Sequence, residues 1–491
     1  MLGRIVGVGE VGRLTWHGVD EHDCHGGVRP AVVGMRDAAV GVQVSPDRGP
    51  QQIVVWGDRE SVPAGVAPSP PVASAIVLGR YLDDSYAPEV RRNITTVALS
   101  RLGANAVYRF SAPFLPTIAS GLDVSLSKLG AAITISEAVG LTAPLVGRRI
   151  DRRHHPTTMA LGLVGVTAGA LVAAAGPNIV WFVVGLVLLA IAKIVFDVAL
   201  GAWTASHVPY ERRGRVVGLV ETSWALGMLV GVSTMGVVTA LSSWRWGYVA
   251  GAVMTSAAVA AVVVRLGNEP RPDVAPYSPD DLDEPRGPGG IGRRGMWMVA
   301  AMFALTAAAQ SLFFTFGAWL EDEFGFGAVA LTAVTFGIGG LELAASTTSA
   351  ARVDRWGKER SVVIGAGLMV PMGLALAAFG TSFVPGVLAL GVFIALFEFS
   401  IVSSISIGSE LVPGAPARGL SAVIAAATMG RAAAATPATW LYEQHGIWVP
   451  ALIGAAFASL TVLCITRVAA SPLRQSAVAT PRPPGDHSVS R

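Results

Sequence analysis

Long apolar runs dominate the chain from about residue 95 onwards and fall into two groups of six. The first six cover approximately 97–120, 129–149, 157–176, 179–206, 214–241 and 245–266. The second six cover approximately 296–319, 327–350, 361–381, 384–409, 418–440 and 446–467. Each run is long enough for a helix across about 30 Å of hydrocarbon, and the alternation typical of a membrane barrel is absent. The pattern predicts an all-α membrane protein with twelve transmembrane helices.

Two short charged signatures occupy matching places between these runs. The sequence GRRIDRR at 147–153 lies between the second and third runs, and DRWGK at 354–358 lies between the eighth and ninth. Their aspartates, Asp151 and Asp354, are 203 residues apart. A charge cluster that recurs in the same setting indicates a duplicated membrane unit. The two groups are therefore expected to form two pseudo-symmetric six-helix bundles.

The segments outside the runs divide the chain into five parts. Residues 94–266 and 296–468 are the two bundles, joined by a charged cytoplasmic linker at 267–295. Residues 1–93 hold no apolar run of the length that a span needs. They are expected to be a disordered extension or the result of a start codon assigned too early, with a small folded domain as the alternative. Residues 469–491 are expected to be a disordered cytoplasmic tail.

The composition narrows the classes of function. Charged residues make up 14% of the chain, whereas soluble domains usually carry about 25%. The net charge is only +3 and apolar spans interrupt the basic residues, so no nucleic-acid partner is expected. Cys24 and Cys464 lie far apart, which predicts neither a disulfide nor a zinc site. No metal, cofactor or nucleotide-binding loop is expected, and no set of residues suggests an enzyme.

The loops alternate between strongly basic ones and ones that are nearly uncharged or acidic. The basic loops follow the even-numbered spans and precede the odd-numbered ones, whereas the loop after the seventh span reads Glu321, Asp322, Glu323. Short cytoplasmic loops retain Lys and Arg. The basic loops are therefore placed inside, and an even number of spans puts both termini in the cytoplasm. This predicts a multi-pass protein of the cytoplasmic (plasma) membrane.

Charged side chains at bilayer depth are costly and usually face a cavity or a partner. The spans hold the following ones: Arg109, Glu137, Lys193, Asp197, Glu221, Glu342, Glu398 and Arg431. The third, sixth, ninth and twelfth spans hold none in their interiors, which predicts four peripheral helices and eight around a polar cavity. The candidates for lining that cavity are Tyr108, Arg109, Lys193, Gln310, Phe313 and Arg431.

Four carboxyl groups are candidates for carrying a coupled proton: Glu137, Asp197, Glu342 and Glu398. Glu137 lies about eight residues into its span, where desolvation favours the neutral form of a carboxyl; an ion pair with Arg109 is the alternative. Lys193 and Asp197 are four residues apart and can pair on one helical face, either as a static pair or as part of substrate or proton movement. A corresponding network in the second half is expected from Glu342, Glu398 and Arg431.

The chain resembles transporters of the major facilitator superfamily over about residues 95–468. The loop signature of that family is matched by Gly147, Asp151 and Arg152, although His154 stands where a glycine is usual. The second copy retains Asp354, Arg355, Gly357 and Lys358. The resemblance implies that these residues form a cytoplasmic gate between the bundles. It also implies a monomer in which a site near the midplane opens to one side at a time.

The fifth span resembles the antiporter signature of drug and metabolite exporters within the same family. Gly218, Gly227, Gly231 and Gly236 match its glycine positions, while Val232 replaces its proline. The leading hypothesis is therefore proton-coupled efflux of a small amphipathic solute. Proton-coupled uptake of an organic acid or other metabolite is the first alternative, and a non-transporting sensor with a carrier fold is the second. The expected partners are the small-molecule substrate, protons and the lipid bilayer.

Overall fold

A computed structural model describes residues 78–142, 154–208, 212–268, 291–408, 411 and 416–470, together with four short strands near the start of the chain. The strands are β1 (Ile5–Val6), β2 (Pro30–Met35), β3 (Ala38–Val44) and β4 (Ile53–Gly57). They pair in antiparallel fashion in the order β1-β4-β3-β2. The sheet belongs to a compact unit of its own, residues 1–73. Whether this segment is a disordered extension or a small folded domain remains a prediction.

The second compact unit is entirely helical in its described residues. Its first half contains α1 (Pro88–Arg109), α2 (Leu115–Leu122), α3 (Leu126–Ala138), α5 (His155–Ala175), α6 (Ile179–His207), α7 (Arg213–Leu226), α8 (Ser233–Leu241) and α9 (Trp244–Leu266). Its second half contains α10 (Gly292–Phe313), α11 (Phe316–Phe324), α12 (Ala328–Trp356), α13 (Lys358–Phe379), α14 (Phe383–Gly408), α15 (Pro416–His445) and α16 (Trp448–Ala469). A 3₁₀ turn (Val139–Thr142) follows α3, and a π-helical stretch (Gly227–Val232) joins α7 to α8.

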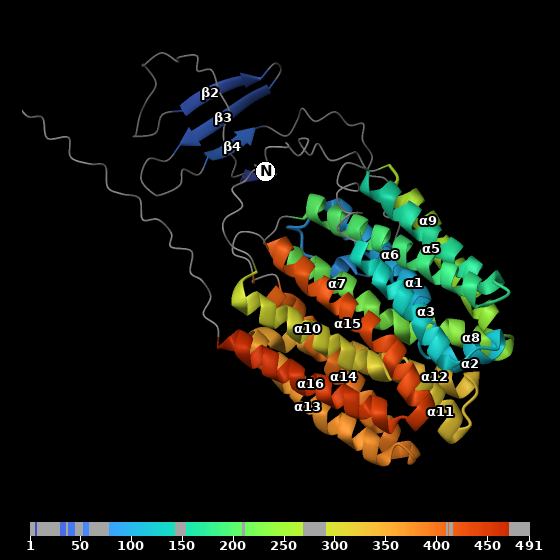
Figure 1. Cartoon of the computed structure of the whole chain (residues 1–491). Coiled ribbons are helices and arrows are strands. Elements are labelled where there is room, and N and C mark those ends of the chain that lie inside the picture. The colour runs from blue at the N-terminus through green and yellow to red at the C-terminus, as the bar shows by residue number, and fades with distance from the viewer. Residues whose placement is uncertain are drawn as a thin grey trace, which may run out of the picture. The chain divides into compact units, whose positions relative to one another are not determined.

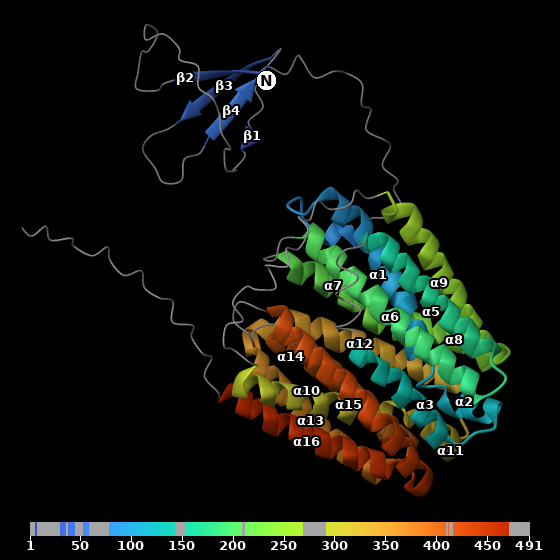
Figure 2. The ribbon, with the colours of Figure 1, turned by 45° about the horizontal axis from the view of Figure 1, so that its top comes forward.

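The two halves lie side by side as separate groups of helices (Figures 1 and 2). Within each half, the helices pack closely on one another, as α5 does on α6 and α13 does on α14. Two seams join the halves. Along one seam α3 contacts α15, and along the other α12 contacts α7, α8 and the π-helical stretch between them. This arrangement confirms the all-helical fold with two bundles that the duplicated signature predicts.

The helix boundaries follow from local chemistry. The side-chain oxygen of Asn178 accepts hydrogen bonds from the backbone N–H groups of Val180 and Trp181 at 3.1 and 3.3 Å, which caps the start of α6. Pro88 opens α1, where its missing N–H costs nothing. Gly357 separates α12 from α13 with a φ of +85°, a conformation that glycine adopts without steric cost. The glycine of the second charged signature therefore has a structural reason to be there.

Nine helical segments of the described residues are long and apolar enough to cross a membrane, and the bent pair of α2 and α3 would be a tenth. Two further helices, α1 and α15, have sufficient length at 22 and 30 residues. However, α1 carries four arginines and a glutamate, which lower its hydropathy. The count of twelve spans therefore remains a prediction.

Small residues allow the helices of the seams to approach closely, as is common in membrane proteins. A Cβ atom on Gly339 of α12 would lie 2.5 Å from the backbone of Leu229 in the π-helical stretch. A Cβ atom on Gly130 of α3 would lie 3.0 Å from the carbonyl oxygen of Ala435 in α15. Each seam thus has a point where backbone meets backbone across the two halves.

Candidate functional site

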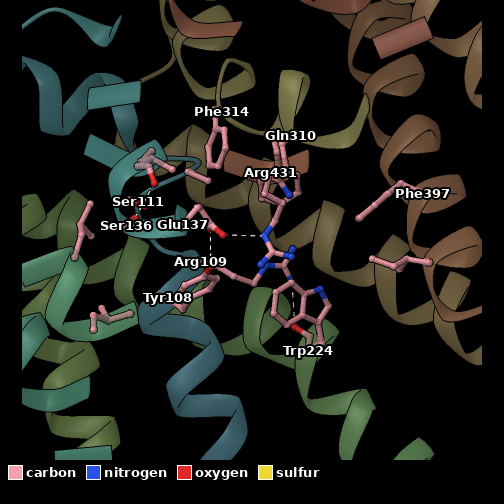
Figure 3. Close-up of a pocket in the computed structure, with 16 residues that line it drawn as sticks. Tyr108, Arg109, Ser111, Ser136, Glu137, Trp224, Gln310, Phe314, Phe397 and Arg431 are labelled. Atoms are coloured by element: carbon pink, nitrogen blue, oxygen red, sulfur yellow. Dashed lines mark hydrogen bonds and ion pairs between the residues drawn. The ribbon is translucent and has the colours of Figure 1, made fainter. Parts of the chain in front are cut away.

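A small cavity of about 80 Å³ lies between the two halves (Figure 3). The lining residues are Tyr108, Arg109, Ser111, Ala112, Ile133, Ser136, Glu137, Leu186, Leu189, Trp224, Gln310, Phe313, Phe314, Phe397, Ile401 and Arg431. They come from both halves, and none of the described lining residues belongs to α5, α9, α13 or α16. These four helices correspond to the spans that the sequence analysis places at the periphery.

Arg109 of the first half forms an ion pair with Glu342 of the second. Two parallel hydrogen bonds join them, at 2.9 Å from Nη1 to Oε2 and at 2.6 Å from Nη2 to Oε1. Nη1 also donates to the carbonyl oxygen of Trp224 at 3.1 Å. The guanidinium carbon lies 4.6 Å from the Trp224 ring centre and 5.3 Å from that of Phe313. The two paired side chains are 5% and 1% exposed, so little of the pair is accessible to solvent.

Glu137 of the first half forms a second ion pair, with Arg431 of the second half. Nε of Arg431 donates to Oε2 of Glu137 at 3.0 Å, and the hydroxyl of Tyr108 donates to Oε1 at 2.5 Å. Nη2 of Arg431 donates to Oγ1 of Thr428 at 3.3 Å. Figure 3 shows Glu137 and Arg431 pointing toward each other from opposite walls of the cavity. The Arg431 side chain is 22% exposed, so this pair is more open than the first.

The glutamates of the two ion pairs occupy comparable places in the internal duplication. Glu137 and Glu342 lie on α3 and α12, 205 residues apart, which is close to the 203-residue offset of the charged signatures. Each carboxylate is bound by an arginine of the opposite half. The expected pairing of Glu137 with Arg109 is therefore wrong. The expected second-half network is wrong as well, because Glu342 and Arg431 each find their partner across the seam.

Glu398 of α14 lies beside this arrangement. Its side chain is 4% exposed. Its Oε2 atom has no hydrogen-bond partner among the described residues. The carboxyl is within electrostatic range of Glu342 and Arg109. Its chain neighbour Phe397 lines the cavity, whereas Glu398 itself lies behind the wall.

A separate ionic cluster lies within the first half and does not line the cavity. Lys193 and Asp197 form the pair that their spacing predicts. Arg101 of α1 joins this pair at 3.6 Å from Asp197, and it bonds Glu221 of α7 at 2.9 Å. The sequence analysis did not single out Arg101. The available signal was its place in the same apolar run as Arg109, about two helical turns before it.

The structure thus divides the sequence-based candidates into groups. The residues that line the cavity are Tyr108, Arg109, Glu137, Gln310, Phe313 and Arg431. The residues that are buried or paired away from its surface are Lys193, Asp197, Glu342 and Glu398. Trp224 was not anticipated as a lining residue, although it is the one tryptophan of the fifth span.

The gate signature is described only in part. Gly147, Asp151 and Arg152 lie outside the described residues. In the second copy, Arg355 is exposed on the last turn of α12, and Lys358 starts α13 after Gly357.

The halves also meet at the end of the molecule that carries α2 and α11. There the carbonyl of Pro113 abuts Gly317, at the start of α11. The backbone N–H of Ser127 donates to Oε1 of Glu443 at 3.1 Å, across the seam between α3 and α15. Further along the same seam, the hydroxyls of Thr134 and Thr436 are 2.8 Å apart. The two halves therefore contact each other at this end.

Comparison with known proteins gives the chain a family. The profile of the Major Facilitator Superfamily matches residues 97–409, which is more than half of the chain. The uncharacterized MFS-type transporter YwfA of Bacillus subtilis (strain 168) is 30% identical over 135 residues, 27% of this chain and 33% of that protein. The putative uncharacterized transporter YgaY of Escherichia coli (strain K12) is 30% identical over 143 residues, 28% of this chain and 34% of that protein. The matched stretch thus spans about a third of each relative.

Solved structures agree on the fold. The human organic anion transporter MFSD10 (TETRAN) aligns with a TM-score of 0.57 at 18% identity, over 77% of this chain and 100% of that one. A bacterial homologue of the human lysosomal transporter Spinster, in an inward-facing and unoccupied conformation, aligns with a TM-score of 0.58 at 11% identity, over 78% of this chain and 96% of that one. With two helical halves, a cavity between them and a matching family profile, the chain belongs to the major facilitator superfamily.

Proposed function

We propose that the protein exports a small amphipathic solute from the cytoplasm in exchange for protons, by alternating access. One observation carries this proposal: the cavity lies between the two halves, and two ion pairs at or behind its wall cross from one half to the other. Alternating access requires the halves to move against each other around a site near the midplane. Ion pairs that join the two halves at that site can be broken or formed when a solute binds there. Aromatic and ionic groups on the same wall suit a solute with an apolar body and a polar end.

The orientation inferred from the basic loops assigns this structure to one state of the cycle. In that orientation the end with α2 and α11 faces the outside. The contacts between the halves at that end then close the cavity to the outside, and the solute enters from the cytoplasm. Export agrees with the resemblance of the fifth span to antiporters. The glycines of this span allow the π-helical stretch to lie against α1, since a Cβ atom on Gly227 would lie 2.9 Å from the side chain of Asn105.

Glu398 is the carboxyl best suited to carry the coupled proton. The other three candidates, Glu137, Asp197 and Glu342, each have an arginine or lysine within ion-pair distance. Glu398 has no such partner among the described residues and is buried. An isolated charge in such a place is costly, so the group binds a proton until water or a cation reaches it. Rearrangement of the neighbouring Arg109–Glu342 pair during the transport cycle brings Arg109 or water to Glu398, and Glu398 then releases its proton.

Flux measurements on the purified protein test this function. A thermal-shift screen with a panel of amphipathic compounds first identifies a ligand, and proteoliposomes then report its movement under an imposed pH gradient. The wild type should accumulate the ligand against its gradient, and Glu398→Gln should move it only downhill. Glu89→Gln, which alters an exposed carboxyl in the first turn of α1, is the matched control. Accumulation by Glu398→Gln at the wild-type level would refute the assignment of the proton site.

The direction of transport has its own test. Cells that lack the gene should be more sensitive to toxic compounds that the carrier binds. Equal sensitivity at confirmed expression of the protein would contradict export. Uptake of an organic acid is the second candidate function, favoured by the two guanidinium groups on the cavity wall. Uptake by intact cells that rises when the external pH falls would support it.

A further inference from the structure

The two arginines on the cavity wall are bound in very different ways. Both terminal nitrogens of Arg109 bond Glu342, two aromatic rings cover its guanidinium group, and only 5% of the side chain is exposed. Arg431 bonds Glu137 through Nε alone and is 22% exposed. Arg109 therefore has no free face for a ligand, whereas Arg431 does.

The free part of Arg431 is the part that recognises anions best. Its Nη2 donates a long 3.3 Å bond to Thr428, and the Tyr108 hydroxyl also lies near the guanidinium group. A carboxylate or sulfonate accepts two parallel hydrogen bonds from a guanidinium edge, and such charge-assisted pairs are among the strongest hydrogen bonds. Because Glu137 bonds only Nε of Arg431, another anion can form the stronger, two-point arrangement with the guanidinium group.

Glu137 can release Arg431 without losing all of its own partners. The Tyr108 hydroxyl donates to the other carboxylate oxygen at 2.5 Å, and Tyr108 belongs to the same half as Glu137. When an incoming anion takes Arg431, Glu137 retains this hydrogen bond. The displacement breaks one ion pair between the halves and replaces it with a bond from Arg431 to the solute.

The rest of the wall suits the apolar body of such a solute. Phe314, Phe397, Ile133 and Ile401 line the same cavity as Arg431. Figure 3 shows Phe314 and Phe397 on different sides of the Glu137–Arg431 pair. The acidic groups Glu342 and Glu398 do not line the cavity, so Glu137 is the one carboxylate that an entering anion meets on the described wall.

We infer that Arg431 is the head-group subsite for an amphipathic organic anion, and that Glu137 occupies this subsite when the solute is absent. The inference rests on the proposed carrier function and names the class of solute: a carboxylate or sulfonate on an apolar body of one or two rings. A neutral or cationic solute of the same shape cannot replace Glu137 on Arg431 and gains nothing from this subsite.

Equilibrium binding to the purified, full-length protein tests the inference with three probes of one shape and different charge: naphthoate, naphthalenemethanol and naphthylmethylammonium. The wild type should bind naphthoate at least about tenfold more tightly than either of the others, the effect of one charge-assisted hydrogen bond. Arg431→Gln should abolish this preference. Glu137→Gln should strengthen naphthoate binding about three- to tenfold, because it removes the competing carboxylate. Arg265→Gln, on an exposed position of α9, should behave as the wild type.

The opposite signs of the two substitutions separate a binding role from a structural one. If Arg431 and Glu137 served only to hold the halves together, both substitutions would weaken binding. That result would overturn the inference, as would equal affinity of the wild type for all three probes or no naphthoate binding at about 1 mM. If Arg431→Gln fails to fold, the gain in Glu137→Gln decides the question.

Flux in proteoliposomes distinguishes this inference from the proposed function. Transport of a neutral or cationic compound without naphthoate binding leaves the carrier function standing and refutes the anion subsite. Naphthoate binding that follows the expected pattern, without flux of any compound, retains the subsite and refutes the carrier function.

Discussion

A second buried carboxyl group, that of Glu398, lies near the Arg109–Glu342 ion pair and can replace Glu342 as the counter-charge of Arg109. The effects of substituting the two glutamates can therefore be predicted. Glu398 is within electrostatic range of Arg109 and has one oxygen without a partner among the described residues. Glu342→Gln removes the bound carboxylate but leaves Glu398 to compensate the charge of Arg109. The double variant, Glu342→Gln with Glu398→Gln, leaves the buried Arg109 without either of these two carboxylates.

The magnitudes follow from what remains buried after each change. An uncompensated buried charge costs about 3–5 kcal/mol, which is the expected loss for the double variant. Glu342→Gln alone should cost about 1–2 kcal/mol, the range for hydrogen bonds that are weakened but partly replaced. Glu398→Gln alone should cost less than about 1 kcal/mol, because a neutral amide replaces a carboxyl that has no ion-pair partner among the described residues. The two single effects should therefore sum to less than the double effect, by about 1–3 kcal/mol of coupling.

Thermal unfolding in detergent at a fixed scan rate measures these differences. With about 2 °C per kcal/mol, the apparent Tm should fall by about 2–4 °C for Glu342→Gln, by less than about 2 °C for Glu398→Gln and by about 6–10 °C for the double variant. Additive shifts would refute the idea that Glu398 can stand in for Glu342. An unchanged Tm in the double variant would refute the burial of Arg109 as a bound charge.

Three further predictions concern other parts of the molecule. Gly339→Val should lower the Tm by several degrees and slow transport, because overpacking against Leu229 costs about 1–3 kcal/mol; Gly337→Val, where a Cβ atom would meet nothing within 4 Å, is the matched control and should change neither. Arg101→Gln should lower the Tm by no more than about 2 °C, because its two carboxylate partners are partly exposed and such pairs contribute about 1 kcal/mol or less; a larger loss would mean that the cluster is sealed from water. Asp151→Asn should slow turnover in flux assays without changing ligand preference, as the gate signature implies, and a changed preference would contradict that role.

Much of the fold follows from the pattern of the chain. The apolar runs and the charged signatures 203 residues apart are enough to predict two related bundles of membrane helices. The Lys193–Asp197 pair was predictable too, because residues four apart on a helix lie on the same face wherever the helix is placed. The absence of charge from the interiors of the third, sixth, ninth and twelfth spans predicts which helices stay away from the cavity, because lipid disfavours charge.

The partners of the cavity charges depend instead on how the helices pack. Arg109 and Glu342 are 233 residues apart, and Glu137 and Arg431 are 294 apart. Hydropathy and spacing identify these side chains as buried and charged, but they describe one helix at a time. Which arginine meets which glutamate is set by the seams, where α3 lies on α15 and α12 on α7 and α8. Close approach at the glycines brings these helices together, and each ion pair forms between side chains that no single helix could place side by side.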